Sequence, residues 1–233
     1  MEAFSERRQT RYFDQERQPP KEAIQEILDE TFDLVMSKQN LMPYSVHILG
    51  PDKFEEKEAM YELSCKVEYP DEEKRNEWRM NRYRLHKEHF EPNKRFPNGN
   101  SQLFAPYVLV LCPRQPKPNP LVQSYLDGAV PHMNYTDLDK ALTGGQAKVE
   151  IGMFAAILGG IAVEKGLSVS YTGCINSGRL HDLMDWLDHE PVVSISLGYK
   201  NPLVSDQYLY NREMFAGKGE DKPAKEEVFN WIE

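Results

Sequence analysis

Residues 147–167 form the one long apolar stretch in a chain that is otherwise heavily charged, and this stretch constrains the fold most. Its hydrophobic run, residues 151–163, lies between Glu150 on one side and Glu164 on the other. Such a run is too short for a bilayer-spanning helix, which needs about 20 apolar residues. The stretch is therefore predicted to be a helix buried inside a globular domain.

The predicted helix has a stop signal and a stripe of small residues. Gly166 stands where a left-handed C-terminal cap would end the helix. Gly152, Ala156 and Gly160 recur at every fourth position, so another backbone could approach closely along that side. Each glycine costs about 1 kcal/mol relative to alanine, so a packing gain should offset it. Two interpretations stay open: a core helix of a monomer, or a helix covered by its own sheet and by a second subunit.

Composition limits the classes of partner. The 233 residues, 40% hydrophobic and 28% charged, are enough for a large core. A net charge of -9 argues against nucleic acid or an anionic membrane as partner, because both need a positive field. The charged N-terminus has no apolar targeting core, and the three cysteines form no CxxC pattern. We therefore expect a cytoplasmic protein without structural zinc.

Hydrophobic periodicity predicts a mixture of helices and strands, in a chain long enough for one large domain or two small ones. Strands are predicted at residues 44–49, 107–112, 167–173 and 191–199. Helices are predicted at residues 21–38, 54–66, 72–89 and 179–189, in addition to the apolar helix. Residues 52–95 carry charges of both signs with aromatic residues among them, which is typical of surface helices that form a cap or lid.

Two polar segments are candidate binding sites. Arg7, Arg8 and Arg11 lie close together near the N-terminus, and arginine forks bind phosphate oxygens bidentately. A solvated charged arm would explain the same cluster. Residues 37–40 are a polar loop between a helix and a strand, which is a common place for a ligand.

A metal site is the weaker explanation for the acidic and histidine residues of the predicted helix at 179–189. His181 and Asp185 stand one helical turn apart there. Ion pairing on a helix surface explains them without a metal, so none is predicted.

Five segments occur in the order and spacing of a known family. Residues 7–13 are similar to an opening Arg-Arg-Ser-x-Arg-x-Phe motif, with Gln9 in place of the serine. Residues 37–44 are similar to a Ser-x-x-Asn-x-Gln-Pro-Trp loop, with Met42 and Tyr44 as departures. The other three are an amide-rich turn before a strand, a glycine- and alanine-rich helix followed by a strand and a glycine turn, and a late strand ending in Gly-Tyr, at residues 98–110, 151–173 and 195–199. Together they resemble the nitroreductase family of flavin-dependent oxidoreductases, over most of the chain except residues 52–95 and 113–140.

The resemblance implies a single FMN-binding domain, residues 1–233, with an α+β fold. Its central, mostly antiparallel sheet would be flanked by helices, with the long apolar helix at a homodimer interface. It implies FMN as the cofactor. The flavin phosphate would be held by Arg7, Arg8 and Arg11, assisted by a cation near the C-terminus, Lys222 or less favourably Lys218.

Further flavin contacts follow from the same resemblance. They are Gln9, Ser37, Lys38, Gln39, Asn40, Asn98, Asn100, Thr172 and Gly173. The loop at residues 37–40 would lie along the ring system and ribityl chain, and one of the two asparagines near 100 would reach the flavin edge. The Thr172 and Gly173 backbone N–H groups would approach the reactive nitrogen.

The implied activity is hydride transfer from NADH or NADPH through FMN to a small acceptor such as a nitroaromatic or a quinone. The lack of a convincing Ser/His/Asp set, carboxylate pair or metal cluster in the sequence agrees with this, since a cofactor carries the difficult step and the protein supplies binding and orientation. A dehalogenase or flavin-modifying relative stays open. So does a flavin-binding or protein-interaction module without turnover.

Overall fold

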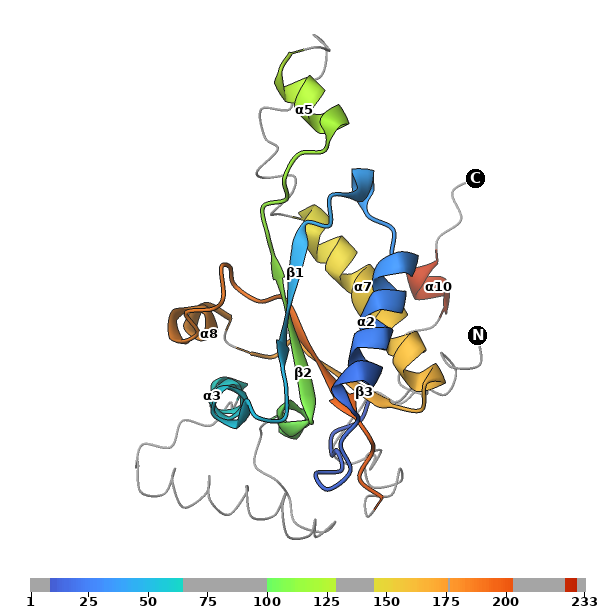
Figure 1. Ribbon diagram of the computed structural model, residues 1–233, viewed down its shortest axis with the longest axis vertical. Helices are drawn as coiled ribbons and strands as arrows, with labels where there is room; N and C mark the ends of the chain where they lie inside the picture. The colour runs from blue at the N-terminus through green and yellow to red at the C-terminus, as the bar shows by residue number, and fades with distance from the viewer. Residues whose placement is uncertain (1–8, 65–99, 129–144, 176, 203–224, 230–233) are drawn as a thin grey trace.

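The computed structural model describes residues 9–64, 100–128, 145–175, 177–202 and 225–229. Their centre is a four-stranded antiparallel sheet in the order β1-β2-β4-β3, with helices on both faces (Figure 1). The strands are β1 Tyr44–Leu49, β2 Tyr107–Pro113, β3 Ser168–Thr172 and β4 Val193–Gly198. The predicted α+β class and antiparallel sheet are confirmed.

The helices form a layer on each side of the sheet. On one face α2 (Lys21–Leu34) packs on α7 (Gly145–Glu164), and α7 contacts β1, β2 and β3 (Figure 1). The other face carries α3 (Phe54–Ser64), the 3-10 helix η2 (Ser101–Phe104) and α8 (Ser177–Leu183). The short elements are η1 (Lys38–Asn40), α5 (Pro120–Leu126) and α10 (Lys225–Val228).

Alternation along β2 separates two hydrophobic cores. Every residue of β2 is buried, as expected for a strand between two neighbours with both faces covered. Leu109 and Leu111 pack with α2 and α7, whereas Val108, Val110 and Cys112 pack with residues of α3 and α8. The sheet therefore has a separate core on each face.

Helix α7 is the predicted apolar helix, and its end has the predicted cap. The Gly166 N–H, at φ 80°, donates to Val163 O at 2.9 Å, and the Leu167 N–H donates to Ala162 O at 2.8 Å. This pair of bonds is a Schellman cap. The helix is longer than its apolar run suggested, and by length and composition alone it could cross a membrane, but 56% of the stretch is buried in the fold.

The stripe of small residues on α7 is only partly open. Gly152 and Ala156 are exposed, whereas Gly160 is buried within its own chain. Gly160 therefore does not belong to the surface that a second subunit could cover.

Two predicted helices end earlier than expected. The first ends at Leu34 because Val35 is extended, at φ -74° and ψ 132°, and directs the chain into η1. The predicted helix at 179–189 is wrong beyond Leu183, where a turn places Met184 and Leu187 in the core. His181 and Asp185 are therefore not neighbours on one helix, and no group of three or more His, Cys, Asp or Glu residues in the described part could hold a metal.

The remaining element predictions have mixed outcomes. The predicted helix at 54–66 is α3, which is described over Phe54–Ser64, and residues 65 and 66 lie outside the described part. The predicted helix at 72–89 lies outside the described residues, so the proposed cap or lid stays a prediction.

Candidate functional site

The N-terminal segment runs along the outer edge of β3. Gln9 forms a parallel bridge with Val169, and the Thr10 N–H donates to Val169 O at 3.1 Å. The Gln9 side-chain amide then continues the pairing: its Nε2 donates to Tyr171 O at 2.7 Å, and its Oε1 accepts from the Tyr171 N–H at 3.1 Å. A glutamine at this position therefore replaces one peptide unit of a neighbouring strand.

A close contact at the end of β4 anchors the same segment. Phe13 is 1% exposed and packs beside Gly198. A Cβ at Gly198 would lie 2.8 Å from Cδ of Pro106 and 3.0 Å from Cδ1 of Phe13, so only glycine leaves room there. This contact fixes the position of Arg11, two residues earlier.

Arg11 lies half-buried beside the chain that follows β3. Burial lowers the pKa of its guanidinium, while Tyr12 and Cys174 raise it. A guanidinium stays protonated in proteins even where burial lowers its pKa. The end of β3 therefore has a fixed positive charge with reduced solvation, which suits an anionic ligand group.

The end of β3 is tied to the amide-rich turn before β2. Gln102 Nε2 donates to Thr172 Oγ1 at 2.9 Å and to Asn100 Oδ1 at 3.2 Å. Asn100 Nδ2 donates to Cys174 O at 3.4 Å. Gly173, between these two contacts, is exposed, and a Cβ there would meet nothing within 4 Å. Hydrogen bonds therefore hold the residues on both sides of Gly173, and the space next to the Gly173 Cα is unoccupied by other residues of the described chain.

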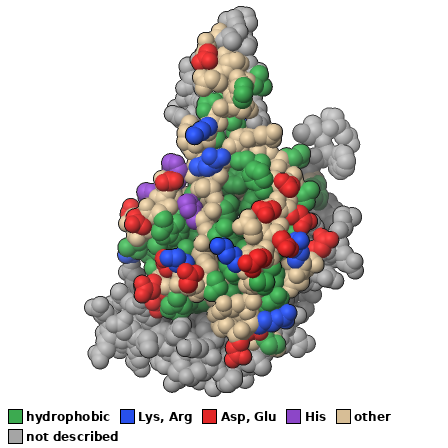
Figure 2. All heavy atoms as spheres, in the orientation of Figure 1, with side chains coloured by type: hydrophobic (Ala, Val, Ile, Leu, Met, Phe, Trp, Pro, Cys, Tyr) green, Lys and Arg blue, Asp and Glu red, His purple; other side chains and the backbone are tan. Residues whose placement is uncertain are grey.

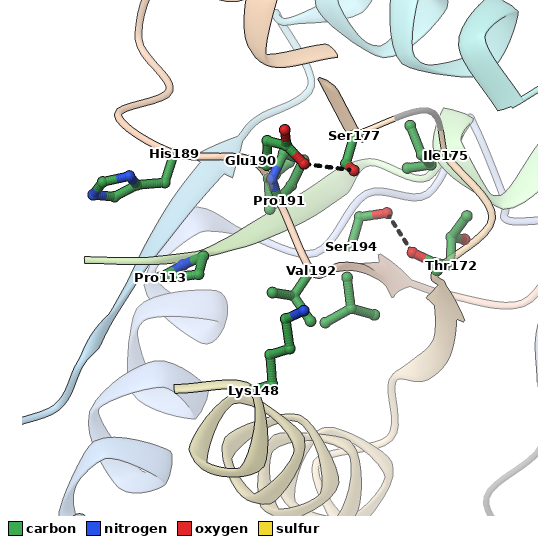
Figure 3. Close-up of a pocket in the computed structure, with 13 residues that line it drawn as sticks. Pro113, Lys148, Thr172, Ile175, Ser177, His189, Glu190, Pro191, Val192 and Ser194 are labelled. Carbon is green, nitrogen blue, oxygen red and sulfur yellow. Dashed lines mark hydrogen bonds between the residues drawn. The ribbon is translucent and has the colours of Figure 1, made fainter. Parts of the chain in front are cut away.

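A pocket of about 510 Å³ opens beside Thr172 and Gly173 (Figure 3). Ser194 on β4 forms part of its wall, and Lys148 on α7 points into it from the opposite helix layer. At the far side Glu190 Oε2 accepts a hydrogen bond from Ser177 Oγ at 3.3 Å. The volume falls within the ~300–1,000 Å³ range of small-molecule sites.

The polar loop at residues 37–40 lies elsewhere on the chain. The Lys38 N–H donates to Glu150 Oε1 at 3.1 Å, which places η1 against the first turns of α7. None of residues 37–40 is among the described lining of the pocket. The described contacts therefore do not bring this loop to the end of β3 within one chain.

Solved structures with the same architecture identify the fold. A nitroreductase-like protein from Streptococcus mutans aligns with a TM-score of 0.61 over 100% of this chain and 97% of its own, at 14% identity. An FMN- and NADPH-dependent nitroreductase from Sphigopyxis sp. aligns with a TM-score of 0.60 over 100% and 98%, at 13% identity. A nitroreductase with bound FMN from Desulfitobacterium hafniense gives 0.55 over 100% and 97%, at 14% identity.

The chain has a nitroreductase-like fold. No protein-family model and no curated protein sequence matches it. At these identities the likeness shows the fold, and the chemistry has to be argued from the residues.

On this nitroreductase-like scaffold the predicted site residues fall into three groups. The structure gathers Gln9, Arg11, Asn100, Thr172 and Gly173 around the end of β3. It places Ser37, Lys38 and Asn40, with the backbone of Gln39, in the separate loop against α7, and the Gln39 side chain lies outside the description. Arg7, Arg8, Asn98, Lys218 and Lys222 lie outside the described residues.

Sequence reasoning missed three residues that shape the candidate site. Gln102 belongs to the amide-rich turn, but nothing in the pattern shows that its side chain reaches Thr172. Lys148 and Glu150 lie two residues apart on α7. Lys148 lines the pocket, whereas Glu150 accepts a hydrogen bond from the loop at residues 37–40. A carboxylate directly before a buried apolar run was the only signal for Glu150.

Proposed function

We propose that this protein is an FMN-dependent oxidoreductase that passes a hydride from NADH or NADPH to a small acceptor. The observation that carries the proposal is the gathering of Arg11, Asn100 and the Thr172–Gly173 backbone at the end of β3, where Thr172 and Gly173 line the pocket. These groups come from three separate parts of the sequence: the N-terminal segment, the amide-rich turn before β2, and the end of β3.

The residues at the site fit FMN chemically. A half-buried arginine suits the anionic phosphate, because a guanidinium binds phosphate oxygens bidentately. The open backbone at Gly173 lets a flat ring approach a strand end without a side chain in the way. Bound FMN would supply the hydride-transfer chemistry. The chain's own task is to hold and orient the ring and to exclude water from it.

Each group then has a separate role in binding. Arg11, with Arg7 and Arg8, holds the phosphate. Asn100 offers an amide to the polar edge of the ring, and the backbone beyond Thr172 donates to the ring's reactive side. Gln102 is a positioning residue, since its hydrogen bonds to Thr172 and Asn100 keep both in place. The loop at residues 37–40 and Lys222 or Lys218 complete the site.

We further propose a homodimer. The described contacts of one chain do not bring the loop at residues 37–40 to the end of β3, so the loop of a second subunit would complete the site there. The dimer surface would be the outer side of α7 and the end of α2. Figure 2 shows hydrophobic side chains gathering along α7, bordered by carboxylates. Phe32, Met36 and Val149 are 58%, 75% and 60% exposed. Beside them the exposed part of the small-residue stripe allows a close approach.

The acceptor would enter the pocket beside Gly173, where nitroaromatics and quinones are the classes to test. The FMN-loaded protein is mixed anaerobically with NADH and, separately, with NADPH, and flavin bleaching is recorded. Bleaching followed by reoxidation with a nitroaromatic or a quinone supports the proposal. FMN that is bound but not reduced by either donor would instead favour a flavin-binding module without turnover.

A further inference from the structure

The loop between α2 and β1 has an energetically costly backbone. Asn40 and Met42 have φ values of 55° and 45°, a left-handed region that side chains other than glycine rarely adopt. Two such residues within three positions persist only where the surroundings determine the conformation. Strain of this kind concentrates at binding and catalytic sites.

Side chains on two sides hold the loop in this shape. Ser37 Oγ accepts from the Met42 N–H at 2.8 Å and closes the loop on itself. From the sheet side, Arg114 Nε donates to Met42 O and Tyr44 O, both at 2.9 Å, and its Nη2 donates to Leu41 O at 3.3 Å. These bonds fix the second half of the loop, Leu41 and Met42, and the start of β1.

The first half is held from α7 by one buried carboxylate. Glu150 is 1% exposed, and its Oε1 accepts from the Lys38 N–H at 3.1 Å and from Gln146 Nε2 at 2.9 Å. Its Oε2 is buried with no hydrogen-bond partner among the described residues. A half-satisfied buried carboxylate is costly, so the bonds that Oε1 makes to the loop and to α7 have to offset that cost.

The charge of Glu150 also acts on Tyr44, at the other end of the loop. Burial is the main cause that raises the pKa of Tyr44 to about 12, Glu150 raises it further, and Arg114 opposes the rise. The loop is therefore clamped between a buried anion on α7 and a cation after β2, at two separate points of contact.

We propose that Glu150 is a positioning residue that fixes the loop at residues 37–42 in the conformation that receives FMN, an inference that rests on the proposed function. Glu150 acts through the Lys38 backbone and need not touch the flavin. Its geometric requirement is reach: the carboxylate must extend from α7 to the Lys38 N–H.

Two conservative substitutions separate reach from charge. Glu150→Asp keeps the charge and shortens the side chain, so the bond to Lys38 is lost. Glu150→Gln keeps the reach and an acceptor oxygen but removes the charge. Glu164→Gln, an exposed carboxylate at the other end of α7, is the matched control. Each protein is examined by amide hydrogen exchange of residues 37–42 without flavin and by the dissociation constant for FMN.

We expect Glu150→Asp to speed exchange at Lys38 and to weaken FMN binding by about tenfold, the size of one lost hydrogen bond. Glu150→Gln should stay within about threefold of the unchanged protein in both measurements. Glu164→Gln should change neither. Faster exchange in Glu150→Asp with an unchanged FMN dissociation constant would overturn the positioning role, as would unchanged exchange. If the unchanged protein binds no FMN, the proposed function fails, whereas the exchange data still decide whether Glu150 orders the loop.

Discussion

The side-chain amide of Gln9 exchanges two hydrogen bonds with the backbone of Tyr171, at 2.7 and 3.1 Å, and so completes the edge of β3. This relationship explains the glutamine found where the resembling motif has a serine. A serine side chain is too short to span both bonds. The N-terminal segment is therefore tied to β3 by side chain as well as by backbone, and Arg11 follows two residues later.

Replacing Gln9 tests that tie. Gln9→Ala removes both bonds and should lower the free energy of unfolding by about 1–3 kcal/mol, because the Tyr171 N–H and C=O lose their partners. FMN binding should weaken as well, since Arg11 loses its anchor. Gln18→Ala, an exposed glutamine in the following turn, is the control. Equal thermal stability of the two variants would show that the amide pairing is unimportant.

The arginines of the N-terminal segment should hold the flavin phosphate. Arg7→Ala with Arg11→Ala should raise the FMN dissociation constant by at least about tenfold, the size of one charge-assisted bond, and leave the fold intact. Arg17→Ala is the matched control, because Arg17 is exposed and lies 3.7 Å above the Tyr199 ring. Binding is measured by flavin fluorescence and folding by circular dichroism. Full flavin content in the double variant would move the phosphate site elsewhere.

The buried Lys57 should give the stability a characteristic pH dependence. Its Nζ donates to Ala105 O at 2.9 Å and Pro106 O at 2.7 Å, and burial lowers its pKa from 10.5 to about 8, against the opposing effect of Asp52 and Glu56. Between these two values the unfolded chain binds more protons than the folded chain, so the free energy of unfolding rises with pH.

The difference between the unchanged protein and Lys57→Met isolates this contribution. Chemical denaturation at several pH values from 7 to 10 should show the unchanged protein gaining stability relative to Lys57→Met as the pH rises. Lys53→Met is the control, since Lys53 is a surface lysine of the same region. Parallel curves for Lys57→Met and the unchanged protein would contradict the lowered pKa.

Two hydroxyls on neighbouring strands should respond to removal in opposite ways. Ser196 Oγ is buried without a hydrogen-bond partner in the described part of the chain, so Ser196→Ala should leave the stability unchanged or raise it. Thr172 Oγ1 accepts from Gln102 Nε2, so Thr172→Val should cost about 1–3 kcal/mol. Thermal unfolding of both variants decides, and a loss for Ser196→Ala would point to a partner for that hydroxyl.

The dimer interface can be probed at the exposed part of the stripe on α7. Ala156→Arg places a long charged side chain where close packing is proposed, and it should shift the sedimentation coefficient to that of a monomer. Gly160 is unsuitable for this purpose, because it is buried in its own chain and a larger residue would disturb folding. Glu164→Arg on the exposed end of the same helix should leave the dimer intact. If Ala156→Arg also remains dimeric, the interface lies on another face.

Local patterns predicted the elements well and their ends less well. Strand β1 was predicted residue for residue, and Gly166 marked the end of α7, because alternation and a left-handed cap are local properties. The end of α8 was wrong because Met184 and Leu187 turn into the core, a tertiary effect that helical spacing does not contain.

The same distinction applies to the site. Contiguous motifs named Arg11, Thr172 and Gly173 as candidates, and the structure brings these three residues together at the end of β3. Gln102 and Glu150 act through contacts between elements that are 70 and 112 residues apart in sequence, to Thr172 and Lys38 respectively. A sequence motif does not contain such distant pairs, so they can be identified only from the folded structure.

The visible absorption spectrum of the purified protein tests the central claim most directly. The protein is incubated with excess FMN and passed through a desalting column, and the spectrum of the protein fraction is recorded. We predict a yellow protein fraction with close to one FMN per chain, and loss of that colour in the Arg7→Ala, Arg11→Ala double variant. A colourless protein fraction that takes up no added FMN would contradict the proposed cofactor, site and activity together.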